Sequence, residues 1–149
     1  MHPIMIAEAD PFYAKFYRIK LQDLGYEVEF VTDGQQLFER LHQQPYALIM
    51  MNVMLPKKNG FLILEELQST RNAETPVMVI TELAQEKDQK EIESFDISAY
   101  FIKNITQIDE ILDAVNELVG KPEEVRKRRS QEATPEPTGQ KKHMKRGKS

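Results

Sequence analysis

The chain has 149 residues, enough for one domain with a buried core and too few for two ordinary domains. It contains no cysteine, which excludes disulfides and thiolate metal sites, and its three histidines are too scattered to predict a histidine-based metal cluster or catalytic triad. No apolar run approaches the roughly 20 residues of a membrane-spanning helix, and no signal-peptide pattern opens the chain. We therefore expect a soluble, cytoplasmic protein.

The formal net charge of −4 is unevenly distributed along the chain. Residues 121–149 contain ten Lys or Arg and four Asp or Glu, a balance of +6, which leaves −10 for residues 1–120. Aromatic residues also disappear after Lys121, so this segment cannot bury enough surface to fold alone. The pattern predicts an acidic folded domain over residues 1–120 and a disordered basic tail over residues 121–149.

In chain order, five short apolar runs are predicted to be strands, and helical patterns separate them. The alternation predicts βα units that form a parallel sheet. The segment from Glu27 to Val31 alternates polar and apolar residues, unlike the other runs, so we expect it at an edge of the sheet. The predicted strands are Ile4–Ala7, Val28–Val31, Ala47–Met51, Val77–Ile80 and Tyr100–Ile102.

The first three predicted helices follow recognisable start signals. Asp10 is the expected cap of the first helix, Pro11 suits its first position, and Gly25 ends it. Asp33 with Gly34 opens the second helix, and Gly60 precedes the third. The residues expected to face the sheet recur at helical spacing: Tyr13, Phe16, Tyr17, Leu21 and Leu24 in the first helix, Leu37, Phe38 and Leu41 in the second, and Phe61, Leu64 and Leu67 in the third.

The last two predicted helices differ in polarity. The fourth, from about Gln85 to Ser94, is polar, with Ile92 as its main apolar anchor, so we expect it to be held weakly. The fifth, from about Gln107 to Val119, has a continuous apolar face and follows an expected cap at Thr106.

The most informative segment is residues 47–60, an apolar run that ends at a single polar side chain, Asn52, and then enters a loop with Pro56 and Asn59-Gly60. Five apolar residues in a row suit a parallel strand that is covered on both faces. Functional groups in open parallel sheets gather where the strands end. The pattern therefore predicts that Asn52 lies at the rim of a site.

From about residue 3 to residue 119, the order of these motifs resembles the receiver domain of bacterial response regulators, of the chemotaxis-regulator kind. The resemblance implies a flavodoxin-like, doubly wound α/β fold, with five parallel strands in the order 2-1-3-4-5 and five helices. It also implies a stand-alone receiver in two-component, or phosphorelay, signal transduction.

The resemblance assigns positions to the family's site. An aspartate that accepts a phosphoryl group matches Asn52, and two acidic residues that help to hold Mg²⁺ match Glu8 and Ala9. The residue that lends a backbone carbonyl to the metal matches Met54. Half of the acidic pair and the phosphoacceptor are therefore replaced.

Other parts of the family's site are retained. The hydroxyl residue after the fourth strand matches Thr81, the lysine after the fifth strand matches Lys103, and the aromatic residue that swings inward matches Tyr100. Asn104 stands where family members commonly have proline. Thr81 and Lys103 are thus remnants of a phosphate site, whereas Tyr100 is equally well explained as a partly buried aromatic of an edge strand.

The replaced residues change what the site can do chemically. The amide of Asn52 is a poor nucleophile and cannot form an acyl phosphate, and Mg²⁺ favours carboxylates, of which Glu8 alone remains. Asp10 comes one residue too late and has a competing role as a helix cap. We expect Lys103 to form an ion pair with Glu8, weak Mg²⁺ binding at best, no other cofactor and no enzymatic activity.

The favoured interpretation is a pseudo-receiver that acts as a phosphorylation-independent adaptor by protein contact. By resemblance, its partner surface is the face made by the helix at residues 85–94, the strand at 100–102 and the helix at 107–119. An ordinary phosphoacceptor receiver, silenced by a substitution at Asn52, is an alternative, although Ala9 argues against a single silencing change.

A second alternative is a protein that binds nucleic acid or another polyanion through its tail. No aromatic residue is interleaved there for base stacking, which argues against sequence-specific binding. The basic tail residues form two clusters: Arg126, Lys127, Arg128 and Arg129, then Lys141, Lys142, Lys145 and Arg146.

Overall fold

The computed structural model describes residues 2–122, which form a five-stranded parallel sheet. The strand order β2-β1-β3-β4-β5 confirms the predicted flavodoxin-like fold and places β2 at an edge. The five strands form four neighbouring pairs, all parallel; Ile4, for example, lies in register with Val28 of one neighbour and with Leu48 of the other. The strands are β1 (Ile4–Ala7), β2 (Val28–Val31), β3 (Leu48–Met51), β4 (Val77–Thr81) and β5 (Ala99–Ile102).

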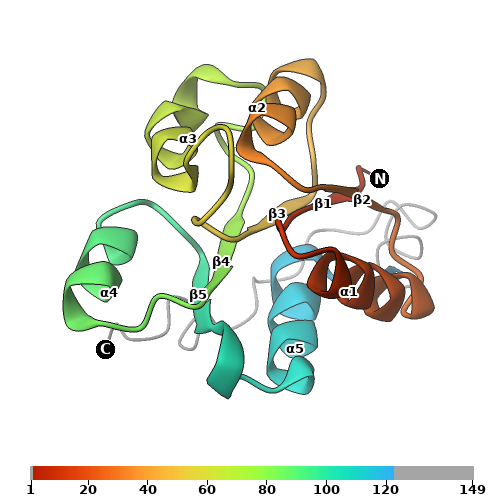
Figure 1. Cartoon of the computed structure of the whole chain (residues 1–149). Helices are drawn as coiled ribbons and strands as arrows, with labels where there is room; N and C mark the ends of the chain where they lie inside the picture. The colour runs from red at the N-terminus through yellow and green to blue at the C-terminus, as the bar shows by residue number, and fades with distance from the viewer. Residues whose placement is uncertain (1, 123–149) are drawn as a thin grey trace.

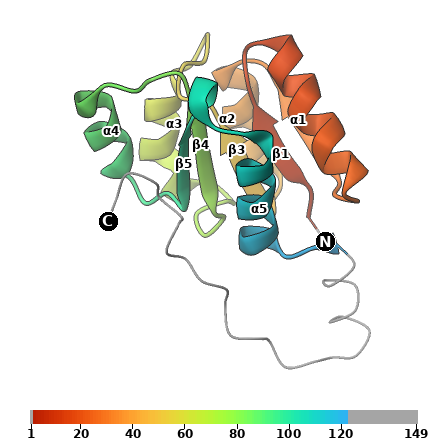
Figure 2. The ribbon, with the colours of Figure 1, turned by 90° about the horizontal axis from the view of Figure 1, so that it is seen from below.

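Five α-helices cover the two faces of the sheet (Figures 1 and 2). Helices α1 and α5 pack on one face, and α2, α3 and α4 pack on the other. None of the helices within residues 2–122 is both long and apolar enough to span a membrane. The helices are α1 (Pro11–Asp23), α2 (Gly34–Gln43), α3 (Gly60–Glu66), α4 (Glu86–Glu93) and α5 (Ile108–Val119), with 3₁₀ turns η1 (Leu67–Ser69) and η2 (Lys103–Ile105).

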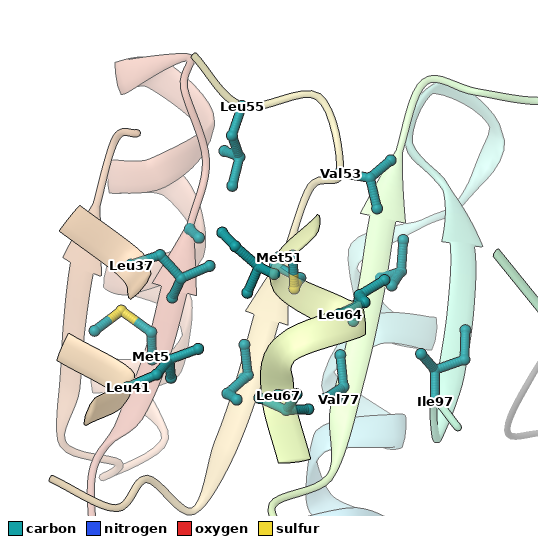
Figure 3. Close-up of a cluster of buried hydrophobic side chains, with 14 of the residues drawn as sticks. Met5, Leu37, Leu41, Met51, Val53, Leu55, Leu64, Leu67, Val77 and Ile97 are labelled. Atoms are coloured by element: carbon teal, nitrogen blue, oxygen red, sulfur yellow. The ribbon is translucent and has the colours of Figure 1, made fainter. Parts of the chain in front are cut away.

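Each face of the sheet has its own apolar core, because successive strand residues point to opposite faces. The β1 residue Met5 faces α2 and α3, whereas its neighbours Ile4 and Ile6 face α1 and α5. Figure 3 shows the first of these cores, in which side chains from α2 and α3 meet those of the strands: Leu37, Leu41 and Leu64 with Met5, Met51 and Val77.

The predicted caps are confirmed for the first two helices. The Asp10 carboxylate accepts a hydrogen bond from the Phe12 backbone N–H, and that of Asp33 accepts one from Gln36. Asn59 caps α3 in the same way. The predicted Thr106 cap of α5 is wrong: Gln107 is the cap residue and forms a capping box with Glu110, while the Thr106 hydroxyl donates to the Ile102 carbonyl.

The prediction that Leu24 faces the sheet is also wrong, because α1 ends at Asp23 and leaves that side chain exposed. Ala14 replaces it in the inward stripe of α1, beside Tyr17 and Leu21. The anchor role predicted for Ile92 in α4 is confirmed, since it is the buried residue of that helix.

The loop between β3 and α3 is fixed by two glycines, which hold it against its neighbours. A Cβ on Gly34 would lie 1.7 Å from the Lys58 carbonyl oxygen, and one on Gly60 would lie 2.5 Å from the Val53 Cα. The Gly34 N–H also donates to the Pro56 carbonyl. This close packing fixes the path of the chain immediately after Asn52.

Candidate functional site

Four polar side chains converge at the carboxyl edge of the sheet. Glu8 follows β1, Asn52 follows β3, Glu82 follows β4 and Lys103 begins the turn after β5. Because the strands are parallel, their carboxyl ends meet at one edge, so residues far apart in the sequence become neighbours. This edge is the candidate functional site.

The centre of the site is an ion pair between Lys103 and Glu8. The Lys103 Nζ lies 2.6 Å from Glu8 Oε1, and the two side chains are only 3% and 5% exposed. The ammonium also lies 4.3 Å from the centroid of the Tyr13 ring, within the range of a cation–π contact. The pair expected from the sequence is therefore present, and it is buried beneath an aromatic side chain.

Glu82 is the second partner of the ammonium and connects it to Asn52. Its Oε2 lies 3.1 Å from Lys103 Nζ, and its Oε1 accepts a hydrogen bond of 2.9 Å from Asn52 Nδ2. The same Nδ2 group donates a longer hydrogen bond, of 3.5 Å, to Glu8 Oε1. Glu82 is 53% exposed, so its carboxylate closes the outer side of the site.

Two further oxygens of the site, Asn52 Oδ1 and Glu8 Oε2, accept hydrogen bonds from the backbone. Asn52 Oδ1 accepts a hydrogen bond from the Met54 backbone N–H at 3.0 Å, which identifies the amide orientation. Glu8 Oε2 accepts one from the Asp10 backbone N–H at 3.0 Å. The neutral amide of Asn52 therefore donates to the two carboxylates, and it adds no negative charge to the site.

The network lowers the pKa of Glu82 and raises the pKa of Lys103. Burial opposes the charge of Glu82, but hydrogen bonds from Asn52, from backbone and from Lys103 outweigh it and hold the pKa of Glu82 below its ordinary value. Burial likewise opposes the charge of Lys103, but its contacts with Glu8 and Glu82 raise the pKa of Lys103. Both groups are therefore ionised at neutral pH.

A cavity of about 10 Å³, room for one water molecule, lies beneath the network. Glu8, Asn52 and Tyr17 line it together with apolar residues of β1, β3 and β4. Burial, followed by the nearby charge of Glu8, raises the pKa of Tyr17 well above its ordinary range. Its hydroxyl is therefore neutral at pH 7.

Thr81 and Tyr100 hold the loop that carries Glu82. Thr81 is fully buried, and its Oγ1 accepts a 3.4 Å hydrogen bond from the Leu83 N–H. The Tyr100 hydroxyl donates to the Leu83 carbonyl at 2.7 Å, and its ring is buried in the core beneath α4. Tyr100 is thus directed inward, more deeply than expected of a partly buried edge residue.

The donors present do not fit Mg²⁺. An ammonium group, itself a cation, lies within 3.1 Å of both carboxylates, and the third group that faces them is a neutral amide. Ala9 contributes no side-chain ligand, the Asp10 carboxylate caps α1, and the backbone carbonyl expected of Met54 would be a neutral ligand. Within residues 2–122, no group of three or more acidic, histidine or cysteine side chains is arranged to hold a metal ion.

Sequence reasoning missed Glu82, which is the residue that connects Asn52 to Lys103. Its position directly after Thr81, at the carboxyl end of β4, was the available signal, because that end lies on the same edge as Asn52 and Lys103. The basic clusters between Arg126 and Arg146 lie outside the described residues, as does most of the predicted tail.

Several solved structures with similar folds are receiver domains or response regulators. The receiver domain of a sensor histidine kinase from Pseudomonas aeruginosa, with magnesium in its active-site cleft, has a TM-score of 0.71 and 23% sequence identity, over 80% of this chain and 98% of that one. A receiver domain protein from Methanospirillum hungatei has a TM-score of 0.73 and 18% identity, over 84% and 98%. At these identities the likeness establishes the fold.

Sequence relatives are longer regulators. The DNA-binding dual master transcriptional regulator RpaA of Synechocystis is 32% identical over 128 residues, which cover 84% of this chain and 52% of that protein. The regulatory protein VanRB of Enterococcus faecalis is 30% identical over 96 residues, 64% of this chain and 42% of that protein. The chain thus spans about half the length of these relatives.

The model of the response regulator receiver domain matches residues 4–116, which include every strand and the whole edge site. This match covers most of the chain, and it agrees with the strand order β2-β1-β3-β4-β5 that was expected for this fold. The chain therefore belongs to the family of response regulator receiver domains, which act in two-component signalling.

Proposed function

We propose that this protein is a pseudo-receiver that transmits its signal by protein contact and does not accept a phosphoryl group at Asn52. The single observation that carries the proposal is the closed network at the edge of the sheet. Lys103 is paired with Glu8 at 2.6 Å, and Asn52 donates to Glu82 at 2.9 Å. A phosphoryl donor would meet a neutral amide, flanked by two carboxylates that repel its charge.

The chemistry of the amide supports this proposal independently of geometry. Phosphoryl transfer to a side chain requires an anionic oxygen to attack and cations to neutralise the equatorial oxygens. Asn52 Oδ1 is neutral and already accepts a hydrogen bond from Met54, and the ammonium of Lys103 is already neutralised by Glu8 and Glu82. Both requirements therefore fail at the same place.

The test is phosphorylation of the full chain by acetyl phosphate with Mg²⁺, followed by intact mass spectrometry. We expect no phosphoryl adduct on the unmodified protein. The matched variants are Asn52→Asp alone and Asn52→Asp combined with Ala9→Asp, which restores the acidic pair. An adduct on the unmodified chain would refute the proposal.

The single variant separates the pseudo-receiver from its first rival, an ordinary receiver silenced at one position. If only Asn52 had been altered, Asn52→Asp alone would restore Mg²⁺-dependent phosphorylation. We expect it to remain unmodified, because Ala9 supplies no ligand and Glu82 faces the new carboxylate. Phosphorylation of the double variant, but not of the single one, is the outcome that the proposal predicts.

We further propose the face formed by α4, β5 and α5 as the partner surface. The loop that leads into α4 is connected to the site through Glu82, and α4 is anchored by one buried residue, Ile92. Such a helix can respond to contacts at either end. An alternative contact region is the carboxyl edge itself, where Phe12, Met54 and Ile105 expose large apolar side chains.

Charge reversal at Glu91 on α4 and polar substitution of Phe12 distinguish these two surfaces. Proteins crosslinked to the full chain in extracts should be lost in the α4 variant and retained in the Phe12 variant. The opposite pattern would transfer the contact to the carboxyl edge and contradict the proposed face.

A second candidate function is polyanion binding by residues 121–149, which carry ten Lys or Arg. The similarity to RpaA, a DNA-binding regulator, supports testing it, although this chain spans only half of that protein. Binding to duplex DNA that falls steeply with salt, and that is abolished when residues 121–149 are deleted, is the expected signature. Unchanged binding after the deletion would exclude the tail.

A further inference from the structure

Two hydrogen-bond donors of the site, Asn52 Nδ2 and Lys103 Nζ, converge on one carboxylate. Glu82 accepts from the amide with Oε1 at 2.9 Å and from the ammonium with Oε2 at 3.1 Å. The two oxygens of one anion are thus bound by two donors, one directly after β3 and the other directly after β5. This is the geometry of a small oxoanion site, with the anion supplied by the chain itself.

The two donors are fixed without help from Glu82. Lys103 is held by Glu8 at 2.6 Å and by the Tyr13 ring, and Asn52 is held through Met54. Both residues are buried, whereas the Glu82 side chain is about half exposed. Removing the Glu82 carboxylate would therefore leave two oriented donors facing solvent, with room for the anion that has been removed.

We propose that Glu82 is the built-in occupant of a latent oxoanion site, which binds free carboxylate or phosphate only when the Glu82 carboxylate is absent. A tethered carboxylate acts at a high effective concentration, so external anions cannot compete with it in the unmodified protein. The inference rests on the proposed function, because it supplies the reason why the site is closed to exogenous anions.

The Glu82 carboxylate also holds the loop that leads into α4. Glu82 is attached to Asn52 and Lys103, while the next residue, Leu83, is bound through its N–H to Thr81 and through its carbonyl to Tyr100. A carboxylate at this place therefore fixes one end of the Glu82–Leu83 segment, and Tyr100 fixes the other. Loss of the carboxylate should loosen the segment, and a bound external anion should leave it loose, since it is not tethered to the loop.

The test compares the unmodified full chain with Glu82→Ala by two-dimensional NMR, without Mg²⁺, in titrations with sodium acetate and with inorganic phosphate at constant ionic strength. The reporters are the side-chain amide of Asn52 and the backbone amides of Leu83 and Met54. We expect saturable shifts of the Asn52 side chain in Glu82→Ala, with a dissociation constant on the order of 10 mM, as about two charge-assisted hydrogen bonds would supply. Binding to the unmodified chain should be at least about tenfold weaker.

The matched control is Glu86→Ala, which removes a carboxylate from the first turn of α4 without touching the site. Glu86 is exposed and pairs with Lys90 at 3.7 Å. This control should behave like the unmodified protein. If Glu82→Ala does not fold, Glu82→Ser removes the same carboxylate and supplies the same comparison.

The inference is overturned if neither anion shifts the Asn52 side chain in a folded Glu82 variant, or if the unmodified chain and Glu86→Ala bind the anions equally well. Saturable shifts with only one of the two anions would identify which oxoanion the two donors bind and would support the site for that class. These outcomes are separate from failure of the proposed function, which would show as a phosphoryl adduct on the unmodified chain in the presence of Mg²⁺.

Discussion

Replacement of Lys103 by methionine tests the energetic role of the buried ion pair. The change keeps an unbranched side chain of similar length but removes the charge, and it leaves Glu8 buried with only the Asp10 N–H and the distant amide of Asn52 as donors. Breaking a buried pair by removing one partner costs about 3–5 kcal/mol. Glu82, which is half exposed, can turn to water and adds little.

The lost cation–π contact with Tyr13 adds about 0.5–1 kcal/mol, so we expect Lys103→Met to lower the free energy of unfolding by about 4 kcal/mol. Glu8→Gln should cost less, about 2 kcal/mol, because Lys103 keeps Glu82 at 3.1 Å and the new amide oxygen can still accept. The loss of unfolding free energy in the double variant should be smaller than the sum of the two single losses by about 1–3 kcal/mol.

Urea unfolding at pH 7, followed by circular dichroism, measures all three variants. The raised pKa of Lys103 means that its contribution is complete below the ordinary value of 10.5 and is lost only as the pH rises through the higher folded value. Neutral pH is therefore the right condition. A loss under about 1 kcal/mol for Lys103→Met, or strict additivity in the double variant, would refute the reasoning.

Three further predictions concern acid stability, loop packing and a buried amide. The pKa of Glu82 in the folded protein lies below its ordinary value of 4.5, so the stability that this carboxylate contributes is present above pH 4.5 and is lost as the pH falls through the folded pKa. We expect Glu82→Gln to flatten this part of the acid unfolding curve. An unchanged curve would contradict this prediction. Gly34→Ala should lower the free energy of unfolding in urea by more than about 3 kcal/mol, because the new methyl would lie 1.7 Å from a backbone carbonyl oxygen. Gly25→Ala has space for the methyl but a φ of +99°, so it should cost only about 1–2 kcal/mol. Equal losses in the two variants would contradict the packing argument. Asn72→Ala should lower the midpoint of thermal unfolding and cost about 3 kcal/mol, because the fully buried amide binds backbone groups of Leu41, Gln44 and Tyr46; a neutral result would show that water replaces it.

The fold was predictable from the sequence because its signals are local and agree with one another. Continuous apolar runs marked the interior strands, alternation marked the edge strand β2, and the Asp10 and Asp33 side chains marked the starts of helices. Helix ends were less certain. Thr106 and Gln107 are both plausible caps, and only the backbone path through the η2 turn decides between them.

The site was only partly predictable. The resemblance located Glu8, Asn52 and Lys103, and the charges of Glu8 and Lys103 suggested their ion pair. The position of Glu82 after β4 could have placed it at this edge, but its contacts with Asn52 and Lys103 could not be predicted, because they depend on the path of the loop after β4. Tyr100 illustrates the same limit, since its inward orientation follows from packing beneath α4 and from the bond to the Leu83 carbonyl.

The central claim is that the chain's own charges occupy this edge of the sheet and leave it unable to bind Mg²⁺ together with a phosphoryl group. The most direct measurement is a two-dimensional NMR titration of the full chain with Mg²⁺ and beryllofluoride, a stable mimic of the acyl phosphate. We expect the amides of Met54, Leu83 and Lys103 to stay unchanged. Saturable shifts of these amides that require both reagents would contradict the account.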